Sequence, residues 1–196
     1  MPFSDATLFP PGTPLPLHWT QMAELHDFLS QDHERLDELL RRLLASGMAT
    51  SQEAFEEFRR GLLRHIAIEE RVLFPELRKV KGTTELEKQL HRDHAALAAL
   101  LVPSPSPQWI EQLVAILEAH NPLEEEEGGL YSMLESLSED RLEELMKQIH
   151  TVPEVRMAPH VDKPVVYRSI EQLVREAEEG RKGQARSQKP EARSQK

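Results

Sequence analysis

The apolar residues of the first half of the chain recur at three- and four-residue steps, which is the spacing of one face of an α-helix. A first helix is predicted after Pro16 and ends at Ser46-Gly47, with apolar positions Met22, Leu25, Leu29, Leu36, Leu39, Leu40 and Leu43. A second is predicted from a cap at Thr50 or Ser51 to Gly82, with apolar positions Phe55, Phe58, Leu62, Ile66, Leu73 and Leu77. Both segments are long enough to bury an apolar stripe against a partner helix.

The same periodicity continues beyond Gly82. A third helix is predicted from near Thr84 to the residue before Pro103, with apolar positions Leu86, Leu90, Leu97 and Leu101. A fourth begins with Trp109, Leu113, Ile116 and Leu117. We expect Pro122 to interrupt this helix, because proline lacks the N–H and its ring clashes with the preceding turn. Gly128-Gly129 is a second weak point, and a short helix over 139–149 follows.

Four long helices joined by short loops predict an all-α fold, an antiparallel up-down four-helix bundle over residues 16–150 with a short extra helix. Residues 1–15 contain four prolines and are expected to form an extended lead-in. Residues 151–180 are expected to form an irregular strip plus a short amphipathic helix, about 166–179, packing on the bundle. Residues 181–196, which repeat ARSQK, are expected to be a disordered tail.

Composition and charge narrow the function. The chain has no cysteine, which excludes disulfides, zinc ribbons, iron–sulfur clusters and thiol catalysis. We see neither a signal-peptide pattern nor an apolar run of membrane-spanning length, so we expect a cytoplasmic protein with no membrane partner. The formal charge is −10 overall and −13 over the first 150 residues, which argues against nucleic-acid binding.

The C-terminal segment differs from this acidic body. Residues 151–196 carry 10 basic and 7 acidic side chains, so the tail is mildly basic and offers a contact for an acidic protein partner. A solvated tail without a partner is the simpler interpretation. The sequence gives no indication of the oligomeric state.

An internal duplication carries the candidate chemistry. Residues 32–40 and 93–101 both read D-H-x-x-L-x-x-L-L, which places His33 and His94 at matching positions. The next helix of each half carries a histidine with a glutamate four residues later, as the pairs His65/Glu69 and His120/Glu124. Residues four apart share one face of a helix. Each half of the chain therefore presents two histidines and one glutamate.

The phase of these histidines matters more than their number. His33 lies three residues before Leu36 and four after Leu29, and His65 lies on or beside the apolar stripe of its helix. One inward histidine is usually only a satisfied core residue, and one such His/Glu pair is usually a surface contact. Both motifs occurring twice, in order and in phase, favour a common metal site. Imidazole with carboxylate suits iron, while zinc and manganese are also acceptable, and bridging glutamates favour two ions.

The residues resemble a known family, the hemerythrin-like or HHE cation-binding domain, over about 17–137. The most specific stretch is HIAIEERVLFPEL (65–77), and the segments SQDHERLDELL, HRDHAALAALL and HNPLEEEEGGLYSML are similar to the other helix motifs. The resemblance implies an oxo- or hydroxo-bridged pair of iron ions. The ligands it implies are His33, His65, Glu69, His94, His120 and Glu124, with Glu69 and Glu124 as the bridging carboxylates.

Two departures from the family pattern leave alternatives open. His91 precedes His94 by three residues rather than four, and is a seventh ligand, a residue behind the ligands, or exposed. The second half also has two extra residues after its first glutamate. Glu124 is favoured by its i+4 spacing, while Glu125 and Glu126 remain candidates. His26 is expected to be partly buried rather than a ligand; His18, His150 and His160 have no supporting context.

The resemblance implies a protein that binds or senses oxygen, or a related small molecule such as peroxide or nitric oxide. One alternative is a di-iron enzyme that decomposes peroxide or reduces nitric oxide. Another is a helical interaction protein without metal. The sequence lacks the Glu-x-x-His motif of ferritin-like oxidases, which argues against that enzyme class. We expect a metal- and oxygen-binding protein rather than an enzyme.

Overall fold

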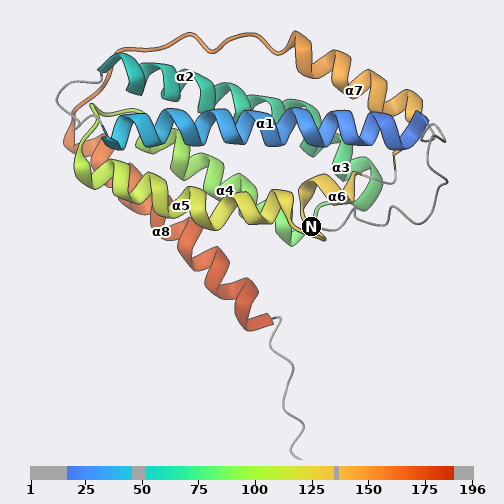
Figure 1. Cartoon of the computed structure of the whole chain (residues 1–196). Coiled ribbons are helices and arrows are strands. Elements are labelled where there is room, and N and C mark those ends of the chain that lie inside the picture. The colour runs from blue at the N-terminus through green and yellow to red at the C-terminus, as the bar shows by residue number, and fades with distance from the viewer. Residues whose placement is uncertain (1–16, 46–51, 135–136, 188–196) are drawn as a thin grey trace, which may run out of the picture. The chain divides into compact units, whose positions relative to one another are not determined.

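The computed structural model describes residues 17–45, 52–134 and 137–187, with side chains over 24–45, 52–134 and 137–184 (Figure 1). Within these ranges no strand occurs, so the predicted all-α class is confirmed. The expectations for the lead-in, for Met22 and His18, for a cap at Thr50 or Ser51, and for the last nine residues lie outside this description. The chain divides into two compact units, a first unit of Met1–Gly82 with Asn121–Met157 and a second unit of Thr83–His120 with Ala158–Lys196. The antiparallel four-helix bundle stays a prediction.

The first unit is built on two long helices, α1 (Leu17–Ala45) and α2 (Gln52–Ile68), which lie side by side and run in opposite directions (Figure 1). Their predicted apolar stripes face the interior. Phe55, Phe58 and Leu29, for example, are at most 1% exposed. Burial of such large side chains is the main force that holds the two helices together.

The predicted second helix is not a uniform α-helix. After α2 the chain makes one wide turn, the π-helix η1 (Glu69–Leu73), and continues as α3 (Phe74–Lys81). The N–H of Phe74 donates to the carbonyl of Glu69, five residues back. Pro75 gives a physical reason, since a proline ring clashes with the carbonyl four residues before it and a widened turn relieves that clash. Single π turns inside α-helices occur frequently at functional sites.

Two shorter helices complete the first unit, α6 (Leu130–Met133) and α7 (Glu139–Thr151). The short helix predicted over 139–149 is therefore confirmed. It lies against α1 and η1. Arg141 of α7 donates through Nε to Glu76 of α3 at 2.8 Å, and Lys79 contacts the same carboxylate oxygen at 3.2 Å. Glu76 is buried, so this ion pair fixes α7 to α3.

The third and fourth predicted helices are α4 (Glu85–Leu100) and α5 (Pro107–Glu125). Thr84 caps α4 by accepting the N–H of Glu87 at 3.0 Å, at the predicted start of that helix. The interruption expected at Pro122 is wrong, because α5 continues through it to Glu125. Pro122 sits in the last turn, where it removes a single N–H, and its own carbonyl still accepts the N–H of Glu126 at 3.1 Å.

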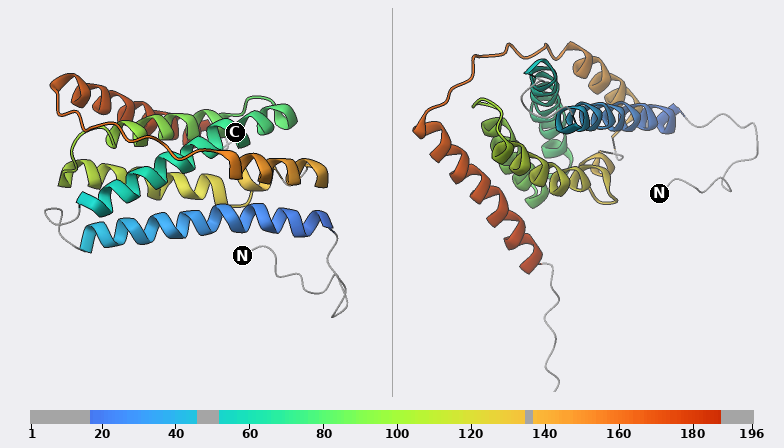
Figure 2. Two further views of the ribbon diagram at one scale, coloured as in Figure 1. Left: turned by 90° about the horizontal axis from the view of Figure 1, so that it is seen from above. Right: turned by 60° about the vertical axis from the view of Figure 1, so that its left-hand side comes forward.

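The C-terminal helix α8 (Pro164–Ser187) is longer than the sequence pattern predicts. It continues past residue 179, so the expectation of disorder is wrong for residues 181–187. The residues there are mostly good helix formers, and the contacts of α8 with α4 in the second unit supply the stability that composition alone did not indicate. Figure 2 shows α8 running beside α4.

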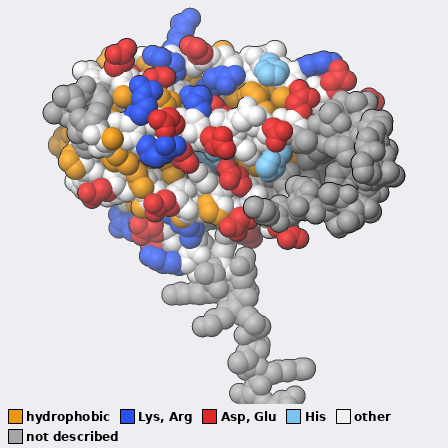
Figure 3. Space-filling model, in the orientation of Figure 1, with side chains coloured by type: hydrophobic (Ala, Val, Ile, Leu, Met, Phe, Trp, Pro, Cys, Tyr) orange, Lys and Arg blue, Asp and Glu red, His pale blue; other side chains and the backbone are white. Residues whose placement is uncertain are grey.

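The strip of residues 152–163 before α8 is irregular, as predicted. It is fastened to the loop after α4, where Asp162 accepts the N–H of Ser104 at 2.9 Å and its hydroxyl at 2.7 Å. Over the described residues, no helix combines the length and the apolar character needed to cross a membrane. On the face in Figure 3, acidic, basic and apolar side chains are interspersed.

Candidate metal centre

Four of the predicted ligands meet inside the first unit, and we call them the first-unit cluster: His33 of α1, His65 of α2, Glu69 of η1 and Glu124 of α5. The Nε2 atoms of His33 and His65 are 2.8 Å apart. Glu124 Oε2 lies 3.3 Å from His33 Nε2, and Glu69 Oε1 lies 3.5 Å from His65 Nε2. The two glutamates are fully buried and the two histidines are at most 6% exposed. One ion could therefore be reached by nitrogen and oxygen atoms from four segments of the chain.

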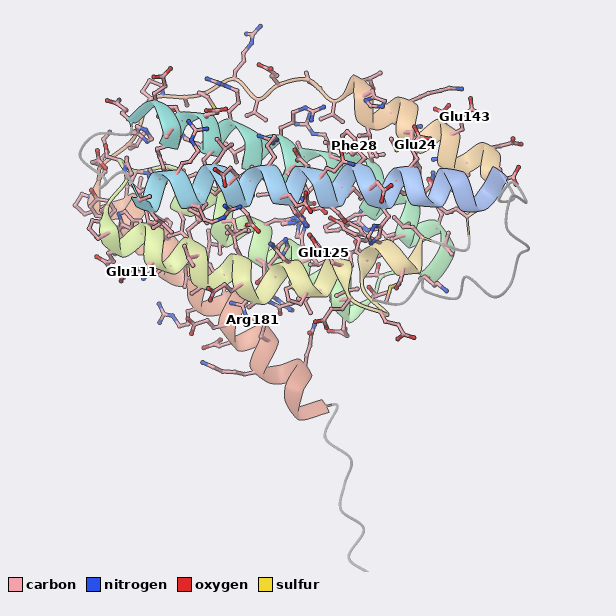
Figure 4. The ribbon with its side chains drawn as sticks, viewed as in Figure 1. Glu24, Phe28, Glu111, Glu125, Glu143 and Arg181 are labelled. Atoms are coloured by element: carbon pink, nitrogen blue, oxygen red, sulfur yellow. The ribbon has the colours of Figure 1, made fainter. Side chains whose placement is uncertain are left out.

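The outer nitrogens of both rings face carboxylates. His65 Nδ1 is 3.0 Å from Asp32 Oδ2, and His33 Nδ1 contacts Glu125 Oε1. Figure 4 labels Glu125 at the end of α5. An imidazole that donates its Nδ1–H to a carboxylate keeps its lone pair on Nε2, which is how metal-ligating histidines are usually held. The two lone pairs then point at each other over 2.8 Å, and this arrangement is favourable only if a cation or a proton lies between them.

The electrostatics of the first-unit cluster favour positive charge. Burial lowers the pKa of His33, but its bonds with Glu124 and Glu125 outweigh burial and raise the pKa to about 10. Burial likewise lowers the pKa of His65, but the charge of Glu69 and the bond with Asp32 raise it to about 9. Without metal, protons therefore supply the positive charge that the buried carboxylates require.

Asp32 itself stays ionised. Burial raises its pKa, but the contacts with His65 and with Arg35 outweigh burial and lower the pKa to about 2. Arg35 donates to Asp32 Oδ1 through Nε at 2.9 Å and through Nη2 at 2.7 Å. Asp32 is thus a charged acceptor fixed from both sides, and it holds the ring of His65 in one orientation.

Tyr131 of α6 is a member of this site that the sequence reasoning missed. Its hydroxyl lies 3.3 Å from Glu69 Oε1, 3.4 Å from His33 Nε2 and 3.5 Å from Glu124 Oε2. Burial and the nearby carboxylates raise its pKa well above 10, so the phenol keeps its proton. The available signal was the family-like segment ending in Leu-Tyr, but only the turn after α5 brings this hydroxyl back to the cluster.

The other two predicted ligands, His94 of α4 and His120 of α5, meet in the second unit. Their ring centroids are 4.9 Å apart and both side chains are buried. Asp93 Oδ2 lies 3.5 Å from His120 Nδ1. Each unit thus contains a pair of buried histidines, with an aspartate facing the Nδ1 atom of the second one.

The structure also places the residues that the sequence left open. Glu124 is fully buried, Glu125 reaches the outer nitrogen of His33, and Glu126 is exposed. His91 is exposed, which is the third of its three alternatives. His26 is half-buried, and its ring stands edge-on to Tyr131 at 6.1 Å.

His150 and His160 are also among the described residues. His150 is exposed and contacts Phe28, and His160 Nδ1 lies 3.3 Å from the carbonyl oxygen of Val102.

The residues of the first-unit cluster fit a metal ion. Two Nε2 atoms that face each other, two buried carboxylates and two outer carboxylates make a donor set of imidazole and carboxylate with excess negative charge. His33, His65 and Glu124 each offer a ligand atom, and these atoms all lie within 4.8 Å of one another. Divalent iron, zinc and manganese all accept this donor set.

Comparison with protein families supports the same chemistry. Residues 24–127, more than half of the chain, match the family model described as the hemerythrin HHE cation-binding domain. Searches among curated proteins and among solved structures gave no match. The matched range contains all six predicted ligands and the π turn that begins at Glu69. The chain therefore belongs to the hemerythrin HHE cation-binding family, whose domain binds metal cations.

Proposed function

We propose that this protein binds a pair of iron ions and uses them to bind or sense oxygen, or a related small molecule such as peroxide or nitric oxide. The proposed ligands are His33, His65, Glu69, His94, His120 and Glu124. The observation that carries the proposal is the pair of Nε2 atoms 2.8 Å apart in the first unit, each in a ring whose Nδ1 faces a carboxylate. Bound iron would supply a redox-active centre at which such a molecule coordinates.

The surrounding side chains would limit access to that centre and offer a hydrogen bond there. The side chains of the first-unit cluster are nearly inaccessible to bulk water. Tyr131 provides a neutral hydroxyl that contacts Glu69 and Glu124, and it retains its proton. A protonated phenol donates a hydrogen bond to negative charge, so it would stabilise carboxylates or an anionic molecule bound beside them.

Metal analysis of the purified full chain tests the first part of this proposal. We expect close to two iron ions per chain after expression in iron-rich medium, and a higher melting temperature with Fe(II) than without it, because binding to the folded state stabilises it. His65→Ala and Glu69→Ala should lower the iron content. His150→Ala, which changes an exposed histidine of α7, is the matched control. A content below about 0.2 iron per chain, with no thermal shift, would favour a helical interaction protein without metal.

Exposure of the reduced protein to gases and peroxide tests the second part. Under anaerobic conditions we would add oxygen, remove it, and follow the absorption spectrum. A band that appears and disappears with oxygen supports a carrier or sensor. Sustained oxygen release from added peroxide, or steady consumption of nitric oxide, would instead assign the protein as a di-iron enzyme.

A further inference from the structure

The two halves of the internal repeat share an aspartate as well as the predicted ligands. In the first unit, Asp32 Oδ2 lies 3.0 Å from Nδ1 of His65. In the second unit, Asp93 Oδ2 lies 3.5 Å from Nδ1 of His120, which is close enough for a charge contact but longer than a hydrogen bond. Each aspartate directly precedes the first histidine of its half, yet faces the histidine of the following helix. The repeated D-H motif therefore provides one ligand candidate and one carboxylate placed beside the Nδ1 atom of another.

The two aspartates differ in where their arginine comes from. Asp32 is held by Arg35, three residues later on the same helix. The corresponding position in the second half is Ala96, which has no charge to offer. In its place, Arg181 of α8 donates through Nη1 to Asp93 Oδ1. An arginine far away in the sequence thus supplies the positive charge that the second half of the repeat lacks at position 96.

Further contacts fix α8 at this position on α4. Gln89 Nε2 donates to Asp93 Oδ1 at 2.8 Å and to the backbone carbonyl of Ala177 at 2.9 Å. Gln184 donates to the backbone carbonyl of Glu85 at 2.8 Å. Asp93, Gln89 and Ala177 are fully buried. A carboxylate buried without a cation is costly, and Arg181 supplies the cation beside Asp93.

A small residue allows this close approach. A Cβ at Gly180 would collide with Oε1 of Gln89. The collision could not be relieved by a small movement of Gln89, because its amide group also bonds Asp93 and the backbone of Ala177. Gly180 therefore sets how near Arg181 comes to Asp93. Figure 4 labels Arg181 on α8.

We propose that Arg181 is a positioning residue that completes the second half of the repeat, fixing Asp93 and, through it, the ring and tautomer of His120. The C-terminal helix lies beyond the matched residues 24–127, and through Arg181 it would contribute to the arrangement of His120. The consequence for metal rests on the proposed function. The consequence for the His120 tautomer does not, since it concerns only contacts inside the second unit.

The test compares Arg181→Ala, Arg181→Lys and the control Lys182→Ala in the full chain. Lys182 is on the same helix and pairs with the exposed Glu178 at 3.6 Å. In metal-free protein, nitrogen-15 NMR of the histidine side chains reports whether His120 keeps its proton on Nδ1. We expect a single Nδ1–H tautomer in the wild type and in Lys182→Ala, and a mixture in Arg181→Ala. Arg181→Lys should restore part of the preference, because it keeps the charge but loses the planar fork.

Titration with Fe(II) alone provides the second readout. Loss of a residue that supports a metal ligand typically weakens metal binding by about 10-fold or more. Arg181→Ala should therefore lower the Fe(II) affinity of the site that includes His120 by roughly 10-fold. Circular dichroism should show unchanged helix content. If Arg181→Ala does not fold, Gly180→Val displaces the same contact and should give the same two results.

Two outcomes would overturn the proposal. One is a wild-type His120 tautomer together with wild-type Fe(II) affinity in a folded Arg181→Ala or Gly180→Val variant. The other is an equal loss in Lys182→Ala, which would indicate a general effect of α8. A wild type that binds no Fe(II) would instead refute the proposed function, and the NMR comparison would still decide the role of Arg181.

Discussion

Metal binding at the first-unit cluster is expected to release protons. In the metal-free protein, His33 and His65 have pKa values raised to about 10 and about 9, so at pH 7.5 the pair carries positive charge. Their Nε2 atoms are 2.8 Å apart, a distance with room for one proton between them rather than two. A metal ion needs both lone pairs and must displace that proton. We therefore expect release of at least about one proton per chain when Fe(II) binds at pH 7.5.

The size of the effect follows from the pKa. With a pKa of about 9 for the displaced proton, competition weakens the apparent affinity at pH 7.5 by about 30-fold relative to the fully deprotonated site. The apparent affinity should accordingly rise by about 10-fold for each pH unit between 6.5 and 8.5, and level off above about 9. Each unit corresponds to about 1.4 kcal/mol of binding free energy.

Isothermal titration calorimetry in two buffers of different ionisation enthalpy measures the proton count directly. Glu124→Gln removes a carboxylate that raises the pKa of His33 and should reduce the release. His150→Ala changes an exposed histidine and should leave the release unchanged. Fewer than about 0.5 protons released per ion, or an affinity independent of pH from 6.5 to 8.5, would refute the assignment of these rings as ligands.

Of four further predictions, the last concerns the iron-loaded protein and the first three concern the metal-free protein. His33 and His65 have raised pKa values in the folded metal-free protein, so their contribution to the free energy of unfolding is complete below pH 6.5. That contribution is lost as the pH rises through 9 to 10, and urea unfolding across this range measures the loss. Arg141→Met should lower the free energy of unfolding by about 2 kcal/mol at pH 7, because it removes a charged hydrogen bond to buried Glu76. Because that bond lowers the pKa of Glu76, the difference from wild type should shrink as the pH falls below 4.5; a constant difference would contradict it. Phe58→Ala should lower the unfolding free energy by about 3–5 kcal/mol, since this ring is fully buried between helices, and a loss under 1 kcal/mol would refute its place in the core. Tyr131→Phe should fold, and its free energy of unfolding should fall by about 1 kcal/mol. The absorption spectrum of the iron-loaded variant should differ from that of the wild type, and an identical spectrum would exclude the hydroxyl from the site.

Much of the local structure could be predicted because the residues of each helix carry the apolar spacing and the capping signals of that helix. The apolar spacing of Phe55, Phe58 and Leu62 predicted a buried stripe, and Thr84 predicted the start of α4, and both were found. Pro122 gave the wrong indication, because it was expected to break its helix and only occupies the last turn. The turn before Pro75 is wider than the regular helix that the apolar spacing predicted. The cost of a proline depends on its position within a helix and on how the neighbouring turn adapts, which composition does not report.

The helical class and the six candidate ligands could be inferred from the sequence, because helix periodicity and i+4 spacing are local properties of one chain segment. The contacts that hold the rings could not be inferred in this way. Asp32 orients His65 from another helix, and Tyr131 returns to the cluster after a turn. Arg181 reaches Asp93 across 88 residues. These contacts depend on which helices lie side by side, and that is fixed by the burial of apolar faces rather than by any pattern within one of them.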